Sequence, residues 1–169
     1  MRALVASVPC GHPYVAHLTA PGRPGPRRLP DPDPSAPHRE ARGPWWPAAM
    51  LEPSWVLGHD FDLMHVHFSF DHRTPAQLQE LVEALRVTGR PLVLTLHDLR
   101  SPHQEDPALL DAQLDVLVPA ATALLTLTAS AADAVAARWG RRPHVVPHPH
   151  VVDLDVIERV RAQRAGHLR

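Results

Sequence analysis

The chain has 169 residues, of which 44% are hydrophobic and 21% are charged, and its net charge at pH 7 is -1. This length holds one domain with a full core, or one half of a two-domain protein. The balanced charge argues against attraction to nucleic acid or to a membrane surface. Cys10 is the single cysteine, and no stretch approaches the roughly 20 apolar residues of a membrane-spanning helix. We therefore expect a cytoplasmic protein without a transmembrane segment or a nucleic-acid partner.

The N-terminal part of the chain combines a strand with a long irregular tract. Residues 2–8 are mostly apolar, which is typical of a strand buried on both faces of a parallel sheet. Residues 21–47 are rich in proline, which excludes a helix or an inner strand and predicts a long surface loop. For Trp45 and Trp46, which close this loop, we favour an anchoring role over an aromatic platform for a sugar. Residues 50–57 predict a short amphipathic helix.

After residue 60, strands and helices alternate regularly. Thr74 and Pro75 are the expected N-cap and first residue of one helix, which Gly89 ends. Ser130 is the expected N-cap of a later helix, which Gly140 ends. Strands are predicted at 61–68, 92–96, 123–127 and 144–146, and helices at 75–88, 107–118, 130–139 and 153–169.

Consecutive strand–helix units indicate the fold class. They predict an α/β protein with a doubly wound, Rossmann-like parallel sheet, in a single domain over residues 1–152. Residues 153–169 are expected to form a C-terminal helix or linker. Sheets of this kind bind ligands in the crevice beyond the carboxyl ends of their strands, so residues at those ends are the candidates for a site.

Two of the predicted strands have histidine at their carboxyl ends, in Asp62-Leu-Met-His-Val-His67 and Pro91-Leu-Val-Leu-Thr-Leu-His-Asp98. We expect His67, His97 and Asp98 at the rim of the crevice, where a neutral imidazole could exchange a proton or bond a substrate hydroxyl. The alternative is that His97 and Asp98 only cap the following turn. His65 shares a strand face with His67 and is expected further inside, bonded to a backbone carbonyl.

Other site chemistries find less support. A His-x-His pair at a strand end also occurs in metal-dependent hydrolases, and further imidazoles are available at His72, His103, His148 and His150. No cysteine cluster or His-Glu-x-x-His helix occurs, so a metal site is the less favoured alternative. The glycine fingerprint of dinucleotide sites and the Walker lysine are both missing from the sequence. We expect neither a metal nor a cofactor.

The order of these motifs resembles the N-terminal domain of family 4 glycosyltransferases, which are retaining enzymes of GT-B architecture. In that architecture two Rossmann-like domains face each other across a cleft, and this chain resembles one half of it. The resemblance covers most of residues 60–152, with the first strand added. It is carried by four segments in register: Asp62–His67, Thr95–Asp98, Leu125–Asp133 and Val145–His148.

The resemblance assigns roles to individual residues. It implies that His97 is the catalytic-cleft histidine that faces the donor sugar, with Asp98 beside it. His67 corresponds to a rim position near the acceptor. Gly11 corresponds to the glycine-bearing loop that approaches the donor phosphates, and we expect Gly11 and the adjacent His12 to contact substrate.

The chain departs from this family pattern in two segments. The loop after the first strand lacks the usual glycine pair and the helix that follows it, and the proline-rich tract takes their place. At His148-Pro149 the family usually continues with Asn-Gly or a similar pair.

The family's second domain, which binds the nucleotide sugar, has no counterpart after Asp153, where one helix is expected. We therefore expect a glycosyltransferase-like protein that supplies the acceptor-side half and is inactive alone. Its expected partners are a nucleotide-sugar donor, a glycosyl acceptor and a separate donor-binding domain or protein. A non-catalytic binding or assembly module is the alternative from another class, ahead of the metal-dependent hydrolase.

Overall fold

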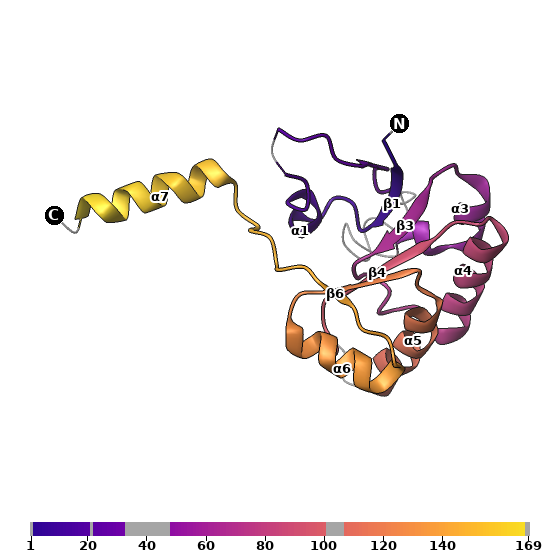
Figure 1. Ribbon diagram of the computed structural model, residues 1–169. Helices are drawn as coiled ribbons and strands as arrows, with labels where there is room; N and C mark the ends of the chain where they lie inside the picture. Colours follow the sequence, from indigo (N-terminus) through magenta and orange to yellow (C-terminus); the bar gives the residue numbers. More distant parts are fainter. Residues whose placement is uncertain (1, 21, 33–47, 101–106, 168–169) are drawn as a thin grey trace.

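The computed structural model describes residues 2–20, 22–32, 48–100 and 107–167. Within them, a six-stranded, entirely parallel sheet has the strand order β2-β1-β3-β4-β5-β6 (Figure 1). The expected α/β class with a Rossmann-like parallel sheet is therefore confirmed. The strands are β1 Leu4–Val8, β2 Arg27–Arg28, β3 Leu63–Val66, β4 Leu92–Leu96, β5 Ala123–Thr126 and β6 His144–Val145.

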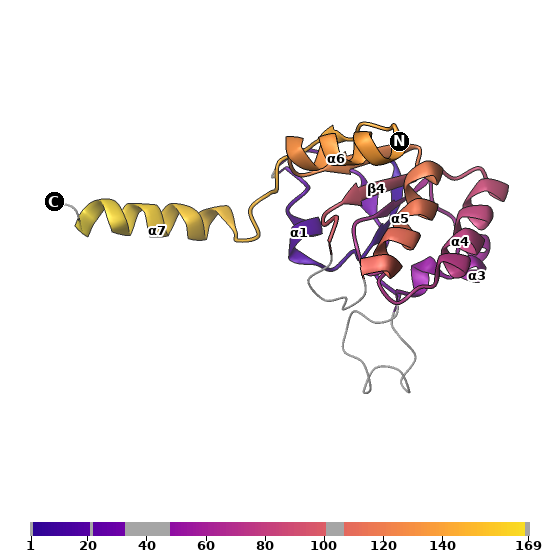
Figure 2. The same ribbon diagram turned by 90° about the horizontal axis from the view of Figure 1, so that it is seen from below.

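The helices cover the two faces of the sheet unequally. Helices α3, α4, α5 and α6 lie along one side, and the single turn of α1 lies on the other (Figures 1 and 2). The second face of the sheet is therefore covered by little helical structure. The helices are α1 Pro13–Ala16, the 3₁₀ helix η1 Ala49–Leu51, α3 Pro53–Gly58, α4 Pro75–Val87, α5 Pro107–Ala120, α6 Ala129–Trp139 and α7 Leu154–His167.

Helix α4 begins and ends where the sequence predicts. The side chain of Thr74 accepts a hydrogen bond from the backbone N–H of Gln77, and the Gln77 side chain bonds the backbone of Thr74 in return. Pro75 occupies the first turn, where its missing N–H costs no hydrogen bond. Gly89 has φ of +67°, a left-handed conformation that favours glycine. Local chemistry is thus sufficient to set both ends of this helix.

The N-cap of helix α6 lies two residues earlier than predicted. Its N-cap is Thr128, which has an extended backbone and whose hydroxyl accepts a hydrogen bond from the N–H of Ala131. The predicted cap, Ser130, already lies inside the helix, so that prediction is wrong. Gly140 ends the helix with φ of +66°, as predicted.

The proline-rich tract at 21–47 is not a loop throughout. Within it, the N–H of Arg27 donates to Ala3 O at 2.9 Å and the N–H of Leu29 donates to Val5 O at 2.9 Å. These bonds make β2 an edge strand on β1. The flanking prolines have no N–H to donate, so the strand stays two residues long.

The helix predicted at 50–57 is broken into η1 and α3. Glu52 separates them with an extended backbone, φ of -80° and ψ of 132°. Pro53 disfavours the helical conformation in the residue before it, which explains the break. Trp45 and Trp46 lie outside the described residues, so their predicted anchoring role stays a prediction.

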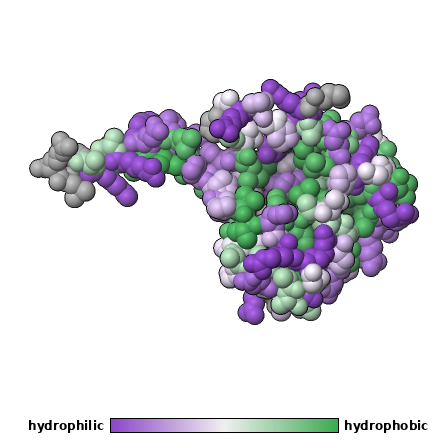
Figure 3. All heavy atoms as spheres, in the orientation of Figure 1, coloured by the Kyte–Doolittle hydropathy of each residue, from purple (hydrophilic) through white to green (hydrophobic). Residues whose placement is uncertain are grey.

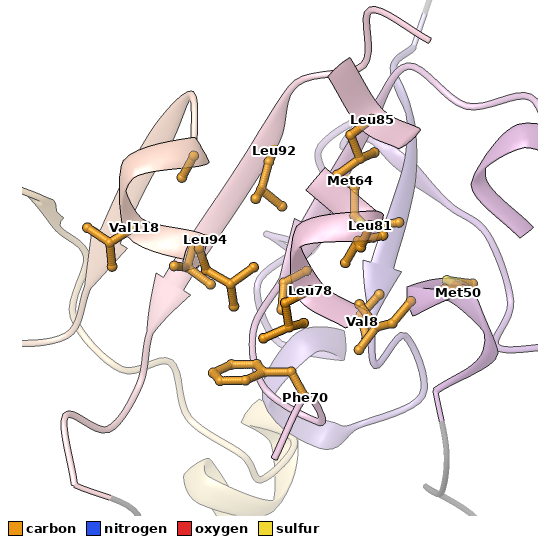
Figure 4. Packing of buried hydrophobic residues seen from close by; sticks show 14 of the residues in the cluster. Val8, Met50, Met64, Phe70, Leu78, Leu81, Leu85, Leu92, Leu94 and Val118 are labelled. Atoms are coloured by element: carbon orange, nitrogen blue, oxygen red, sulfur yellow. The ribbon is translucent and has the colours of Figure 1, made fainter. Parts of the chain in front are cut away.

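Side chains on the sheet are sorted by the twofold period of the strands. Polar side chains of Ser7, His65 and Thr95 lie on the face away from α4 and α5. Figure 4 shows apolar strand residues packed against the buried leucines of α4. On the face toward the helices, the strand residues are apolar and buried: Ala6, Val8, Met64, Val66, Leu92, Leu94 and Leu96.

The strand order creates a switch point between β1 and β3. From β1 the chain passes to β2 on one side, whereas β3 pairs with the other side of β1. The connections therefore diverge at the carboxyl ends of these two strands, and such a divergence leaves a crevice in open α/β sheets. His12 follows β1 and His67 follows β3, so both lie at this point.

Helix α7 projects from the rest of the molecule (Figures 1 and 2). It falls within the expected terminal segment 153–169. Leu154 and Val160 are exposed on it, and Val156 and Ile157 are half-buried. Figure 3 shows apolar side chains along its first turns. Across the described parts of the chain, no helix is both long and apolar enough to cross a membrane.

Candidate functional site

A pocket of about 380 Å³ lies at the carboxyl ends of the central strands. Four of the residues predicted as site residues line it: His12, His67, His97 and Asp98. The structure therefore brings together side chains from the loops after β1, β3 and β4. We call it the histidine pocket, and its polar and aromatic wall is formed by His12, Tyr14, His67, Phe68, Asp71, Thr95, His97, Asp98 and His148.

Tyr14 joins the histidines of this pocket. Its ring centroid lies 4.8 Å from that of His97, 5.0 Å from that of His148 and 5.6 Å from that of His67. Tyr14 is 3% exposed, so its buried ring is a shared neighbour of the three imidazoles. Tyr14 is not among the site residues predicted from the sequence. A signal was present, because Tyr14 is the only tyrosine and lies in the loop after the first strand.

The single turn of α1 positions Tyr14. Pro13 begins this turn, and Nδ1 of His12 accepts a hydrogen bond from the N–H of Tyr14 at 3.2 Å. The expectation that no helix follows the first strand is therefore wrong, although the helix is only four residues long. His12 consequently both caps the turn and packs edge-on against Phe68, with 4.7 Å between ring centroids.

His67 carries an unpaired polar atom in the wall of the pocket. Its side chain is almost fully buried, and its Nε2 lies 3.2 Å from Oγ of Ser7. Its Nδ1 has no hydrogen-bond partner among the described residues. Burial, together with the charge of Arg28 and the neighbouring imidazoles, lowers the pKa of His67 from 6.5 to about 2. The ring is therefore neutral, and its Nδ1 lies inside the pocket wall with almost no accessible surface.

The ring of His65 lies against that of His67 within the sheet, tilted by 35°, with 3.8 Å between the ring centroids. Its Nε2 lies 2.8 Å from Oγ1 of Thr95, so the expected bond to a backbone carbonyl is wrong. Carbonyls inside a parallel sheet are engaged by the neighbouring strands, whereas a threonine on the next strand is free to turn toward the ring. Burial and the charge of Arg28 lower the pKa of His65 to about 4.

His97 and Asp98 form the more open side of the pocket. Nδ1 of His97 lies 3.7 Å from Oδ2 of Asp98. Burial lowers the pKa of His97, Asp98 opposes this shift, and His148 adds to it. The His97 side chain is 25% exposed, so a ligand can reach a neutral imidazole that lies beside a carboxylate. This pair could accept and donate hydrogen bonds to hydroxyl groups or move a proton.

The loop after β3 is held in place by Gln113 of α5. Gln113 is fully buried, and its Nε2 donates to the carbonyl oxygens of Phe70, Asp71 and Arg73 at 3.2, 3.1 and 2.6 Å. The same loop contains Ser69 with φ of +69°, a conformation that costs a non-glycine residue about 1–2 kcal/mol. This part of the pocket wall is therefore a constrained segment, not a loose one.

Gly11 does not line the pocket. Its N–H donates to Oδ2 of Asp31 at 2.7 Å, and the N–H of Cys10 donates to Oδ1 of the same carboxylate at 2.8 Å. Asp31 thus takes the backbone donors that were expected to approach a phosphate. Burial, and secondly the charge of Asp31, raises the pKa of the Cys10 thiol, which disfavours the reactive thiolate.

Among the described residues that line the histidine pocket, none is an arginine, and the chain contains no lysine. In the parts of the chain that the structure describes, no three His, Cys, Asp or Glu side chains are grouped so that they could hold a metal ion.

Searches for similarity to known protein families, to curated proteins and to solved structures find no match. The histidine pocket itself is therefore the basis for the function proposed below.

Proposed function

We propose that this chain supplies the acceptor-side half of a glycosyltransferase, and that an uncharged, hydroxyl-rich acceptor binds in the histidine pocket. The observation that carries the proposal is a pocket wall of neutral imidazoles in which His97 is partly exposed beside Asp98. A ligand hydroxyl can pair with the exposed His97 ring, and such a hydrogen bond contributes about 0.5–1.5 kcal/mol.

The pocket wall has the composition that a sugar ring needs. His67, His97 and Asp98 offer acceptors and a donor to hydroxyl groups, and Tyr14 and Phe68 offer aromatic surface to the carbon skeleton. The volume of about 380 Å³ lies within the range of small-molecule sites, about 300–1,000 Å³. In this proposal His97 is the catalytic-cleft histidine, and Asp98 orients it.

In this proposal the diphosphate of the nucleotide-sugar donor does not bind in the histidine pocket. A diphosphate requires cations or free backbone N–H groups, and the pocket-lining residues include no arginine. The amides of Cys10 and Gly11 are engaged by Asp31. We therefore propose that a separate domain or protein holds the donor and that transfer requires both halves.

Sugar binding is the first test of this proposal. Saturation-transfer NMR with neutral methyl hexosides should detect binding to the purified chain, with glucose 6-phosphate no better bound. His97→Ala should weaken binding about tenfold, the effect of losing one hydrogen bond of about 1.4 kcal/mol. His150→Ala is the matched control, because His150 is exposed and outside the pocket. Equal losses in both variants, or no binding by the wild type, would refute the proposal.

Turnover separates the two parts of the proposal. The purified chain mixed with a nucleotide sugar and a bound hexoside should form no glycoside. If it forms one without a second protein, the half-enzyme part is wrong even though the pocket assignment stands.

A non-catalytic assembly module is the second candidate, and one observation favours it. Leu57 and Val87 are 60% and 64% exposed beside a groove of about 560 Å³ between α3 and α4. Exposed apolar side chains that gather in this way mark interaction surfaces. Sedimentation velocity tests this candidate, which predicts self-association that Leu57→Lys abolishes. A wild-type chain that is monomeric at high concentration would remove its support.

A further inference from the structure

A second cavity, of about 210 Å³, lies on the sheet face that α4 and α5 leave uncovered. Its floor contains His65 and Thr95, and Tyr14 divides it from the histidine pocket. Arg28 of the edge strand β2 is its one cation among the described residues. We call it the Arg28 cavity, and its apolar wall is formed by Leu18, Leu125, Leu127 and Val146.

Arg28 is a half-buried guanidinium without a carboxylate. Its Nη1 donates to Oγ1 of Thr19 at 2.6 Å, and no carboxylate of the described residues lies within ion-pair distance of it. Two other arginines do have such partners: Arg73, in the loop before α4, pairs with Glu52, and Arg138 of α6 pairs with Asp111 and Asp115. Removing a charge from water is unfavourable unless an opposite charge pairs with it. Arg28 is partly buried, and among the described residues it has no such counterion.

The floor of the Arg28 cavity carries no second positive charge. Burial is the largest cause of the lowered pKa of His65, and the charge of Arg28 adds to it. The His65 imidazole is consequently neutral and offers no competing positive charge. An anion entering the cavity therefore meets a single cation and walls that are otherwise uncharged.

We propose that the Arg28 cavity binds a small carboxylate carried on a compact apolar body. The planar guanidinium matches a carboxylate through two parallel hydrogen bonds. The leucine and valine walls suit an apolar body, and they disfavour a fully hydrated ion such as phosphate. A dry apolar cavity of about 150 Å³ accepts a benzene ring, so about 210 Å³ accommodates a ring of that size with a carboxylate.

Calorimetric titration with matched probes tests the charge requirement. Benzoate should bind to the wild-type chain with a dissociation constant of about 1 mM or lower. Benzamide, which has the same shape without the charge, should bind at least about tenfold more weakly, and inorganic phosphate should not compete. Equal binding of benzoate and benzamide would overturn the proposal, as would the failure of benzoate to bind at about 10 mM.

Adjacent arginines provide the matched variants. Arg28→Gln should weaken benzoate binding at least about tenfold, whereas Arg27→Gln should leave it unchanged, because Arg27 is exposed and outside the cavity. Arg28→Lys keeps the charge and serves if Arg28→Gln does not fold; it should retain binding, weakened by the loss of the bidentate geometry. Equal losses from Arg27→Gln and Arg28→Gln would mean that benzoate binds elsewhere.

This inference is independent of the proposed sugar site. His97→Ala should weaken hexoside binding about tenfold and leave benzoate binding intact, because His97 lines the histidine pocket and not the Arg28 cavity. Benzoate binding without hexoside binding would uphold the Arg28 cavity alone. Hexoside binding without benzoate binding would leave the sugar site standing and refute this proposal.

Discussion

Single buried residues decide the chemical character of the histidine pocket. His65, His67 and His97 have pKa values below the usual one, and burial is the largest cause in each case. Their neutrality makes the pocket a set of hydrogen-bonding groups with little positive charge. Tyr14, which touches two of them, fixes the distances between them. Residue by residue, the site is thus suited to hydroxyl groups better than to anions.

The lowered pKa values of His65 and His67 make stability depend on pH. The unfolded chain binds protons near pH 6.5, whereas the folded chain resists them down to about 4 at His65 and about 2 at His67. Their stability contribution is therefore complete above pH 6.5 and is lost as the pH falls below it. The slope is about 1.4 kcal/mol per pH unit for each histidine.

Urea denaturation at about pH 7.5, 6.5 and 5.5 measures this slope. In His67→Gln the slope should decrease by up to about 1.4 kcal/mol per pH unit, because the contribution of His67 is gone while those of His65 and His97 remain. His150→Gln, which changes an exposed histidine, should keep the wild-type slope. A slope unaffected by His67→Gln would show that other groups cause the pH dependence.

Gln113 is the residue whose loss should most disturb the pocket wall. Gln113→Leu leaves the carbonyl oxygens of Phe70, Asp71 and Arg73 without their buried donor. We expect the free energy of unfolding to fall by about 2–3 kcal/mol, measured by urea denaturation. Gln79→Leu is the control, because Gln79 is exposed on α4, and should change stability by less than about 0.5 kcal/mol. Similar losses in both variants would contradict this role.

At the scale of elements, helix ends show where local chemistry is sufficient and where it is ambiguous. The capping box of Thr74 and Gln77 leaves one possible start for α4. The start of α6 offers two hydroxyl residues, Thr128 and Ser130, that both suit an N-cap. The extent of β5, which ends at Thr126, decides between them, because the chain leaves the sheet just before Thr128.

The cap of α6 gives a test with its own control. Thr128→Ala should destabilise the protein by about 1 kcal/mol, because the N–H of Ala131 loses its acceptor. Ser130→Ala should cost less than about 0.5 kcal/mol, since alanine is a better residue inside a helix. Thermal denaturation followed by circular dichroism measures both. The reverse order of effects would place the cap at Ser130 after all.

At the scale of the whole molecule, the sheet is protected unevenly and one helix stands apart. Four helices bury the face lined by Met64 and Leu94, and the other face holds the Arg28 cavity. The histidine pocket lies at the carboxyl edge between them, where Leu110 and Leu114 of α5 also line it. Helix α7 contributes little to the buried core, because none of its side chains is in it.

Truncation should separate α7 from the folded body. A chain ending at Asp153 should keep a melting temperature within about 2 °C of the full chain, because it loses no buried contact. A chain ending at Arg142 also loses β6 and the hydrogen bond from the N–H of Val146 to Thr126 O. Its melting temperature should be at least about 5 °C lower than that of the full chain. A large loss of stability on removing α7 alone would show that it packs against the body in solution.

The sequence by itself determined the alternation of strands and helices, the caps at Thr74, Gly89 and Gly140, and the histidines at two strand ends. These features are local, because periodicity and turn chemistry act over a few residues. Four of the five predicted site residues share one pocket. This follows from the predicted sheet, because parallel strands present their carboxyl ends at one edge.

Only the tertiary structure decided which distant segments meet. Strand order set His12 beside His67, brought His148 and Tyr14 into the same pocket, and turned Gly11 toward Asp31. It also placed Arg28 on the open sheet face, although the proline-rich tract predicts a loop there. Pairing between segments far apart in the chain depends on the burial and hydrogen bonds that the whole fold gains. No window of neighbouring residues contains that information.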